Sequence, residues 1–180
     1  MRIFGYGSLI WRPDFAYARR EPARLNGFCR RFYQGSTDHR GVPGAPGRVV
    51  TLLPDPGASC VGMLYEVSEV QMPKILGALD VREQLGYLRM QIQVTSLEQA
   101  SVPVSAWMYA ATPENPDYLG PAPIAQMAHQ IATTRGVSGT GREYLMQLAR
   151  WHHEIGVDDP HVAALKTAVQ ALENRNDGPR

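Results

Sequence analysis

The order in which strand-like and helix-like segments follow one another most constrains the fold of this 180-residue chain. Short apolar or alternating segments that resemble strands dominate its first two thirds, at residues 1–4, 25–33, 48–53, 60–67, 87–95 and 102–110. Segments with helical spacing mostly come later, at residues 68–79, 124–134, 141–154 and 161–173. Strands that come first and helices that follow predict an α+β fold with an antiparallel sheet or a small barrel. We expect one domain over residues 1–180, with a polar, disordered tail at 174–180.

Glycine and proline mark the loops of this chain. The longest irregular stretch runs from Gln34 to Arg48 and contains GVPGAPG at residues 41–47, which excludes a helix or a central strand there. A loop of this length in a compact domain is usually functional or mobile. A turn at residues 54–57 (PDPG) is predicted to separate two strands, and turn signals fill residues 12–24.

Charge and composition exclude several classes of partner. The formal net charge is +1, which predicts neither nucleic acid nor an anionic membrane as a partner. No apolar stretch approaches the ~20 residues of a spanning helix, and the N-terminus lacks the regions of a signal peptide. Cys29 and Cys60 do not make a disulfide framework. We expect a cytoplasmic protein, and the sequence does not indicate its oligomeric state.

The segment Gly5-Tyr6-Gly7-Ser8 is the first candidate site. Two glycines let the backbone turn sharply, and successive N–H groups in such a turn can bind an anion. A dinucleotide-binding loop needs a third glycine where this chain has Ile10. A simple passage from strand to turn, without any ligand, is an equally good interpretation.

Glu83 is the second candidate, because it stands between a predicted helix and a predicted strand. A carboxylate there can transfer a proton, although a surface glutamate paired with Arg82 or Arg89 is the commoner case. His152 and His153 are adjacent, and no spacing typical of metal ligands occurs, so no metal site is expected. Spacing leaves a Ser-His-Asp set open, yet Ser8 is not in a nucleophile elbow.

Five stretches together resemble the ChaC-like, glutathione-specific γ-glutamylcyclotransferases. They are FGYGSLIWRPDF (residues 4–15), RRFYQGSTDHRGVPGAPGRVVTL (30–52), LDVREQLGY (79–87), NPDYLGPAP (115–123) and SGTGREYLMQLA (138–149). They follow the family's order and spacing. Where the family often has a lysine and a glycine, this chain has Gln84 and Leu85.

The resemblance implies a γ-glutamylcyclotransferase-like small mixed or antiparallel β-barrel flanked by α-helices. It implies a lyase that uses no cofactor and converts a small-molecule substrate, glutathione, into 5-oxoproline and cysteinylglycine. The family's catalytic glutamate corresponds to Glu83. Its substrate loop corresponds to residues Ile3, Phe4, Gly5, Tyr6, Gly7, Ser8 and Leu9.

Chemistry of this kind needs no nucleophile from the protein, because the substrate's own α-amine attacks its γ-carbonyl. Glu83 is expected to move the proton, which requires a partly desolvated carboxyl with a raised pKa. Arg40 or Arg48 could bind the substrate's distal carboxylate, and Tyr144 could add a hydroxyl, although structural roles are as probable for each.

Three other functions stay open. The substrate could be another γ-glutamyl amino acid or a γ-glutamylamine. The fold could serve as a non-catalytic binding domain, or Ser8 could belong to a hydrolase.

Overall fold

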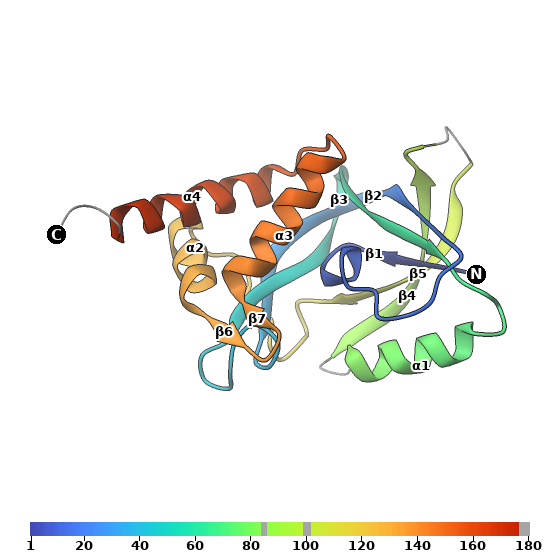
Figure 1. The fold of residues 1–180 in the computed structure, drawn as a ribbon, viewed down its shortest axis with the longest axis horizontal. Coiled ribbons are helices and arrows are strands. Elements are labelled where there is room, and N and C mark those ends of the chain that lie inside the picture. Colours follow the sequence, from blue (N-terminus) through green and yellow to red (C-terminus); the bar gives the residue numbers. More distant parts are fainter. Residues whose placement is uncertain (84–85, 99–101, 177–180) are drawn as a thin grey trace. The chain divides into compact units, whose positions relative to one another are not determined.

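The structure is a computed structural model that describes residues 1–83, 86–98 and 102–176. Five strands form a closed barrel in the order β1, β3, β2, β4, β5 (Figure 1). Their bounds are Arg2–Gly5 (β1), Arg19–Ser36 (β2), Gly47–Glu66 (β3), Tyr87–Ser96 (β4) and Val104–Ala111 (β5). β1 pairs antiparallel with β3 and parallel with β5, whereas β4 pairs antiparallel with β5. The predicted small mixed barrel in an α+β fold is confirmed.

The two longest strands, β2 and β3, are longer than the sequence predicts. β2 begins at Arg19, inside the segment expected to be turns, and β3 runs without interruption through residues 54–57. The prediction of two strands separated by a turn there is therefore wrong. Pro54 and Pro56 lie at exposed positions, where a missing N–H is tolerated. The Asp55 carboxylate accepts the N–H of Gly57 at 3.2 Å.

The chain divides into two compact units. Unit 1 comprises Met1–Arg30 and Thr51–Pro116, and unit 2 comprises Arg31–Val50 and Asp117–Arg180. Because β2 and β3 each contribute residues to both units, the division does not contradict a single domain, which stays a prediction.

Unit 1 contains the barrel strands β1, β4 and β5 together with helix α1 (Met72–Arg82). Its core is mostly apolar. The alternation of β4 buries Ile92 and Val94 as expected for a half-buried strand, whereas Leu88 is 52% exposed. Its most deeply buried side chains include Ile3, Phe4, Tyr65 and Met108.

Unit 2 contains three helices that pack against one another, α2 (Ile124–Thr133), α3 (Gly141–Glu154) and α4 (Pro160–Asn176). α3 has the predicted bounds, and its N-terminus carries a capping box between Thr140 and Glu143. α4 extends beyond the predicted helix into the expected tail, and residues 177–180 lie outside the described residues. In the described part of the chain, no helix has both the length and the apolar character needed to cross a membrane.

The glycine- and proline-rich segment connects β2 to β3 within unit 2. Val42 and Ala45 exchange backbone hydrogen bonds of 3.1 and 3.0 Å around Pro43 and Gly44. Gly44 has a φ of 81°, as the third position of a type II turn requires. The predicted irregular loop is therefore a tight hairpin end, flanked by the ends of two long strands.

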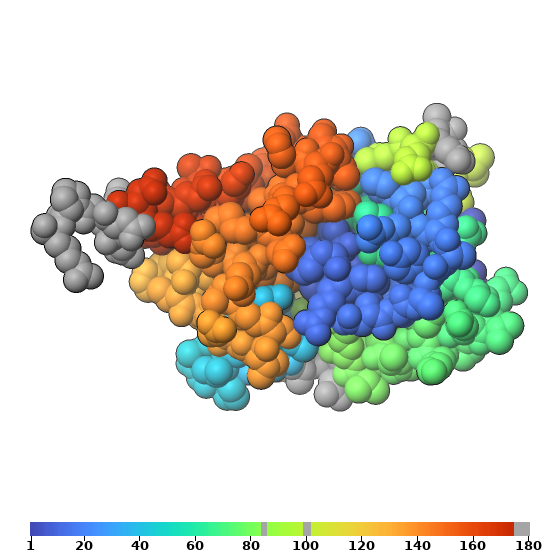
Figure 2. Space-filling view, viewed as in Figure 1, coloured from blue at the N-terminus to red at the C-terminus, as the bar shows by residue number. Residues whose placement is uncertain are grey.

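A short hairpin that the sequence did not predict precedes α3. It consists of β6 (Arg135–Gly136) and β7 (Gly139–Thr140). Its tip donates from the N–H of Val137 to the Asp38 carbonyl at 2.9 Å. In Figure 2 the cyan segment near residue 40 lies against the orange segment that contains this hairpin.

Candidate active site

The predicted substrate loop leaves strand β1 and turns back over it in unit 1. β1 ends at Gly5, and a 3-10 turn, η1, follows at Ser8–Ile10. A Cβ on Gly5 would lie 2.6 Å from the Cβ of Leu9, so only glycine lets the turn pack this closely. The loop is thus held against the strand from which it comes.

The hydrogen bonds of the 3-10 turn leave its first donors without acceptors inside the turn. The N–H of Ile10 donates to the Gly7 carbonyl at 3.0 Å, and the N–H of Arg12 donates to the Ser8 carbonyl at 2.8 Å. The N–H groups of Ser8 and Leu9 precede these bonds, and a helical turn offers no internal acceptor for such groups. This is the donor arrangement that an anion needs, and anion binding by the loop stays a prediction.

Tyr65 fixes the far end of the loop. Its hydroxyl, on β3, donates to the Leu9 carbonyl at 2.6 Å and lies 3.2 Å from the Ile10 carbonyl. Burial raises the pKa of Tyr65 to about 12, so the hydroxyl keeps its proton and stays a donor. Phe15 and Tyr17 pack edge-on against its ring. No sequence pattern distinguishes Tyr65 from the other apolar positions of its predicted strand.

Glu83 forms the C-terminal cap of helix α1, as expected from its place after a helix. Its N–H donates to the Leu79 carbonyl at 2.8 Å, and its carbonyl accepts from the N–H of Tyr87 at 3.4 Å. Gly86 closes this turn with a φ of 81°, and a Cβ there would lie 2.7 Å from the Asn115 amide nitrogen. The two family departures, Gln84 and Leu85, lie outside the described residues.

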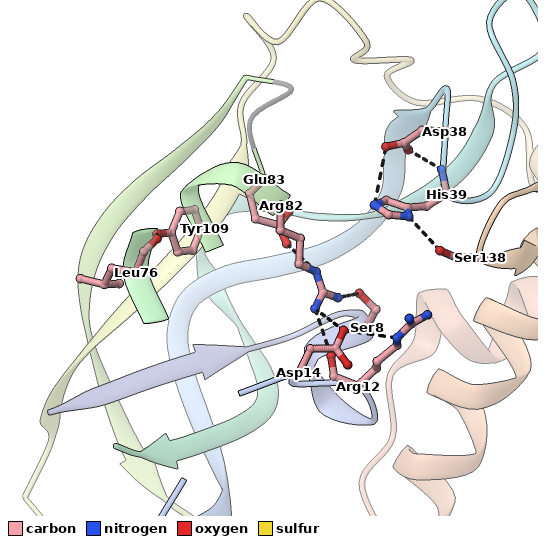
Figure 3. Close-up of polar contacts among 10 residues, drawn as sticks. All are labelled: Ser8, Arg12, Asp14, Asp38, His39, Leu76, Arg82, Glu83, Tyr109 and Ser138. Carbon is pink, nitrogen blue, oxygen red and sulfur yellow. Dashed lines mark hydrogen bonds and ion pairs between the residues drawn. The ribbon is translucent and has the colours of Figure 1, made fainter. Parts of the chain in front are cut away.

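One guanidinium connects Glu83 to the loop (Figure 3). The Glu83 carboxylate is 18% exposed, and its Oε1 lies 3.4 Å from Nε of Arg82. Nη2 of Arg82 donates to Oγ of Ser8 at 2.9 Å. The two candidates from the sequence, Glu83 and the loop, thus contact the same guanidinium, although Arg82 and Ser8 are 74 residues apart.

The three weaker candidates all lie in unit 2. Arg40 is buried, donates to the Thr140 carbonyl at 3.2 Å, and places its guanidinium 5.4 Å from the Tyr144 ring centre. Arg48 is also buried and donates to the Gln130 side chain at 2.7 Å. Nη1 of Arg48 bonds further carbonyl oxygens, those of Phe32 and Gly120. Arg48 therefore has an evident structural role, and substrate binding by any of the three stays a prediction.

Unit 2 also contains a serine, a histidine and an aspartate in contact. Nδ1 of His39 lies 2.8 Å from Oγ of Ser138, and its Nε2 lies 3.6 Å from Oδ2 of Asp38 (Figure 3). The His39 and Asp38 side chains are 50% and 45% exposed. Side chains this exposed are typical of a surface contact between a loop and a hairpin. Among the described residues, no group of three or more His, Cys, Asp or Glu side chains is placed to hold a metal ion.

Comparison with known proteins places the chain in a family. The model of a family described as ChaC-like protein matches residues 1–172. A Homo sapiens protein named glutathione-specific gamma-glutamylcyclotransferase 1 is 46% identical over 174 residues, covering 94% of this chain and 78% of its own. The Danio rerio protein of the same name is 43% identical over 173 residues, with coverages of 94% and 88%.

Solved structures agree with this result. A crystal structure of a yeast γ-glutamyl cyclotransferase specific to glutathione has a TM-score of 0.88 at 30% identity, covering 95% of this chain and 96% of its own. A further γ-glutamyl cyclotransferase has a TM-score of 0.57 at 16% identity, which shows a shared fold alone. The chain belongs to the ChaC-like protein family.

Proposed function

We propose that this chain is a glutathione-specific γ-glutamylcyclotransferase, a lyase that converts glutathione into 5-oxoproline and cysteinylglycine. Its Homo sapiens and Danio rerio relatives carry that activity in their names at 46% and 43% identity. The observation that carries the proposal within the chain is the connection of the Glu83 carboxylate to Ser8 through Arg82. The carboxylate can exchange a proton beside a loop whose N–H groups can bind an anion.

The reaction is an intramolecular aminolysis. The α-amine of the γ-glutamyl group attacks its own γ-carbonyl carbon and forms the five-membered ring of 5-oxoproline. The amide bond to cysteine breaks, and its nitrogen leaves with an added proton as the new amine of cysteinylglycine. Correct positioning of such internal groups is worth roughly 7–11 kcal/mol, so the protein need not supply a nucleophile.

Glu83 moves the proton in this proposal. A free α-amine has a pKa of about 7.7–8.0 and is mostly protonated at neutral pH, so a base must remove its proton before attack. Glu83 accepts that proton and then transfers it to the departing nitrogen, so one carboxyl acts as base and acid. Its low exposure, 18%, favours the partly desolvated carboxyl that this role requires.

The loop orients the substrate and stabilises negative charge. We assign the α-carboxylate and the oxyanion of the tetrahedral intermediate to N–H groups within residues 6–9, with the Ser8 hydroxyl beside them. Removal of one oxyanion donor typically costs about 2.7–4 kcal/mol of transition-state stabilisation. Arg40, Arg48 and Tyr144 remain candidates for substrate contacts. Their replacement by alanine would raise KM for glutathione if they bind it.

The direct test is incubation of the purified protein with glutathione and detection of both products by mass spectrometry. Equal amounts of 5-oxoproline and cysteinylglycine are expected. Free glutamate in place of 5-oxoproline would indicate hydrolysis, and absence of turnover would indicate a binding domain. A panel of γ-glutamyl amino acids and γ-glutamylamines tests the second candidate function, a broader cyclotransferase. A cytoplasmic location, in which the buried Cys29 and Cys60 stay reduced, is part of the proposal.

A further inference from the structure

Arg82 occupies the position between the two parts of the proposed active site. It is the last residue of helix α1, directly before Glu83, and its side chain is 21% exposed. The sequence predicts for Arg82 only the role of a surface partner of Glu83. Its contacts give it a larger role.

Each nitrogen of the Arg82 guanidinium has a different partner (Figure 3). Nε faces Oε1 of Glu83 at 3.4 Å, and Nη2 donates to Oγ of Ser8 at 2.9 Å. Nη1 donates to the Arg12 carbonyl at 3.1 Å and to Oδ2 of Asp14 at 3.2 Å. A planar fork with five donors can make these contacts at once, and a lysine ammonium cannot.

Asp14, which accepts one of these hydrogen bonds, has an uncommon backbone conformation. Its φ is 56°, the one positive value among the described non-glycine residues. Aspartate and asparagine tolerate this conformation better than other side chains. The Asp14 carboxylate lies 3.2 Å from Nη1 of Arg82 and 3.3 Å from Nε of Arg12. The Arg82 guanidinium is therefore shared between two carboxylates, those of Asp14 and Glu83.

We propose that Arg82 is a positioning residue of the cyclotransferase site, which sets the orientation and the charge of Glu83 while holding the Ser8 hydroxyl in the substrate loop. This inference rests on the proposed function. The guanidinium favours the ionised form of Glu83, and Asp14 offsets part of that effect by competing for the same cation. The Glu83 carboxylate therefore stays ionised, and able to act as a base, at neutral pH. Its attraction to Arg82 is weak enough that it can still accept a proton.

If Arg82 had only a structural role, replacement by lysine would give a different result. A cation in the last turn of a helix interacts favourably with the helix dipole, and any cation serves that purpose. A lysine at position 82 would then preserve both stability and activity. The positioning role requires the planar guanidinium with its several donors. Lysine therefore restores the positive charge but not the contacts of the guanidinium with Glu83 and Ser8.

The experiment combines kinetics with a ¹³C NMR titration of the Glu83 carboxyl, assigned by its loss in Glu83→Gln. In Arg82→Gln we expect the Glu83 titration to move up by about 1 pH unit and kcat to fall about 10- to 100-fold. In Arg82→Lys we expect the titration to stay near the wild-type value, with kcat still reduced. Arg19→Gln is the matched control, because Arg19 is 46% exposed and pairs with Glu21 at 3.0 Å. It should change neither quantity.

Asp14→Asn keeps Arg82 in place and provides an independent variant should Arg82→Gln not fold. It removes the competing charge and should move the Glu83 titration downwards, opposite to Arg82→Gln. Two outcomes would overturn the inference. One is a Glu83 titration that moves neither in Asp14→Asn nor in any folded Arg82→Gln protein, and the other is a wild-type kcat in Arg82→Lys. A wild-type protein that makes no 5-oxoproline would overturn the proposed function, while the titration would still decide whether Arg82 controls Glu83.

Discussion

The hydroxyl of Tyr109 donates to the Asp80 carboxylate at 2.5 Å and so connects strand β5 to helix α1 three residues before Glu83. The same carboxylate lies 3.1 Å from Nη1 of Arg89 on β4. Arg89 in turn places its guanidinium 5.5 Å from the ring centre of Trp107. Helix α1 is therefore anchored to the barrel wall close to the end that carries Glu83.

Tyr109→Phe should weaken this anchor and lower turnover. Burial, with the hydrogen bond to Asp80, raises the pKa of Tyr109, so the hydroxyl remains a donor throughout the working pH range. Its loss should cost about 1–2 kcal/mol in the free energy of unfolding, because a bond to a charged acceptor is lost. Thermal unfolding and kcat would measure both effects. Tyr17→Phe, at an exposed tyrosine, is the control, and equal behaviour of the two variants would contradict the anchor.

Glu83→Gln should keep the fold and lose turnover. The amide has nearly the shape of the carboxylate but cannot accept a proton, and general-base catalysis typically contributes 10²–10⁴-fold. Initial rates of 5-oxoproline formation would measure the loss, and calorimetry of glutathione binding would show that the substrate still binds. Glu66→Gln, in an exposed pair with Arg2 at 3.7 Å, should retain full activity. Normal turnover in Glu83→Gln would remove the central role from this residue.

Two glycine-to-alanine variants in unit 1 should have effects of opposite sign. Gly5→Ala places a Cβ 2.6 Å from that of Leu9 and should destabilise the protein by about 1–3 kcal/mol while displacing the loop. Gly77→Ala in helix α1 meets nothing within 4 Å and should stabilise it by up to about 1 kcal/mol. Denaturant unfolding measures both. A stable, fully active Gly5→Ala protein would show that the close approach of the loop is unnecessary.

His161 should make stability depend on pH under mildly acidic conditions. Its Nε2 accepts the N–H of Phe32 at 3.0 Å, and burial lowers the pKa of His161 to about 4. The unfolded chain has a pKa near 6.5 at this residue, so it binds more protons than the folded chain between about pH 6.5 and 4. The stabilisation is full above pH 6.5 and is lost as the pH falls to 4, by about 2 kcal/mol after solvent screening.

His161→Gln should flatten this part of the stability curve. The measurement is the midpoint of urea unfolding between pH 4 and 7, compared with His129→Gln at an exposed position of α2. The exposed variant should follow the wild-type curve. An unchanged slope in His161→Gln would show that other groups cause the acid sensitivity.

The whole chain should unfold in one transition, as the single-domain prediction requires. β2 and β3 contribute residues to both compact units, so the five-stranded barrel belongs to neither unit alone. Trp151 lies in unit 2, and fluorescence in a Trp11→Phe, Trp107→Phe background reports on that unit alone. Its midpoint should coincide with that of far-ultraviolet circular dichroism. Two separate midpoints would indicate two domains.

Local sequence patterns predicted the elements that depend on local interactions. Helix α3 has the predicted bounds because its apolar spacing and capping box are both local signals. Local patterns also predicted that Glu83 follows a helix and that a turn at residues 5–8 follows β1. The turn predicted at residues 54–57 was wrong, because proline and glycine at exposed strand positions do not interrupt pairing.

The α+β class, the family and the identity of the candidate acid all follow from sequence patterns. Periodicity, glycine placement and motif order are properties of neighbouring residues. Three contacts depend on the folded chain: Arg82 lies between Glu83 and Ser8, Tyr65 holds the loop, and Tyr109 anchors α1. Each of these contacts joins residues 29–74 positions apart, and such pairings arise from closure of the barrel, which no local pattern encodes.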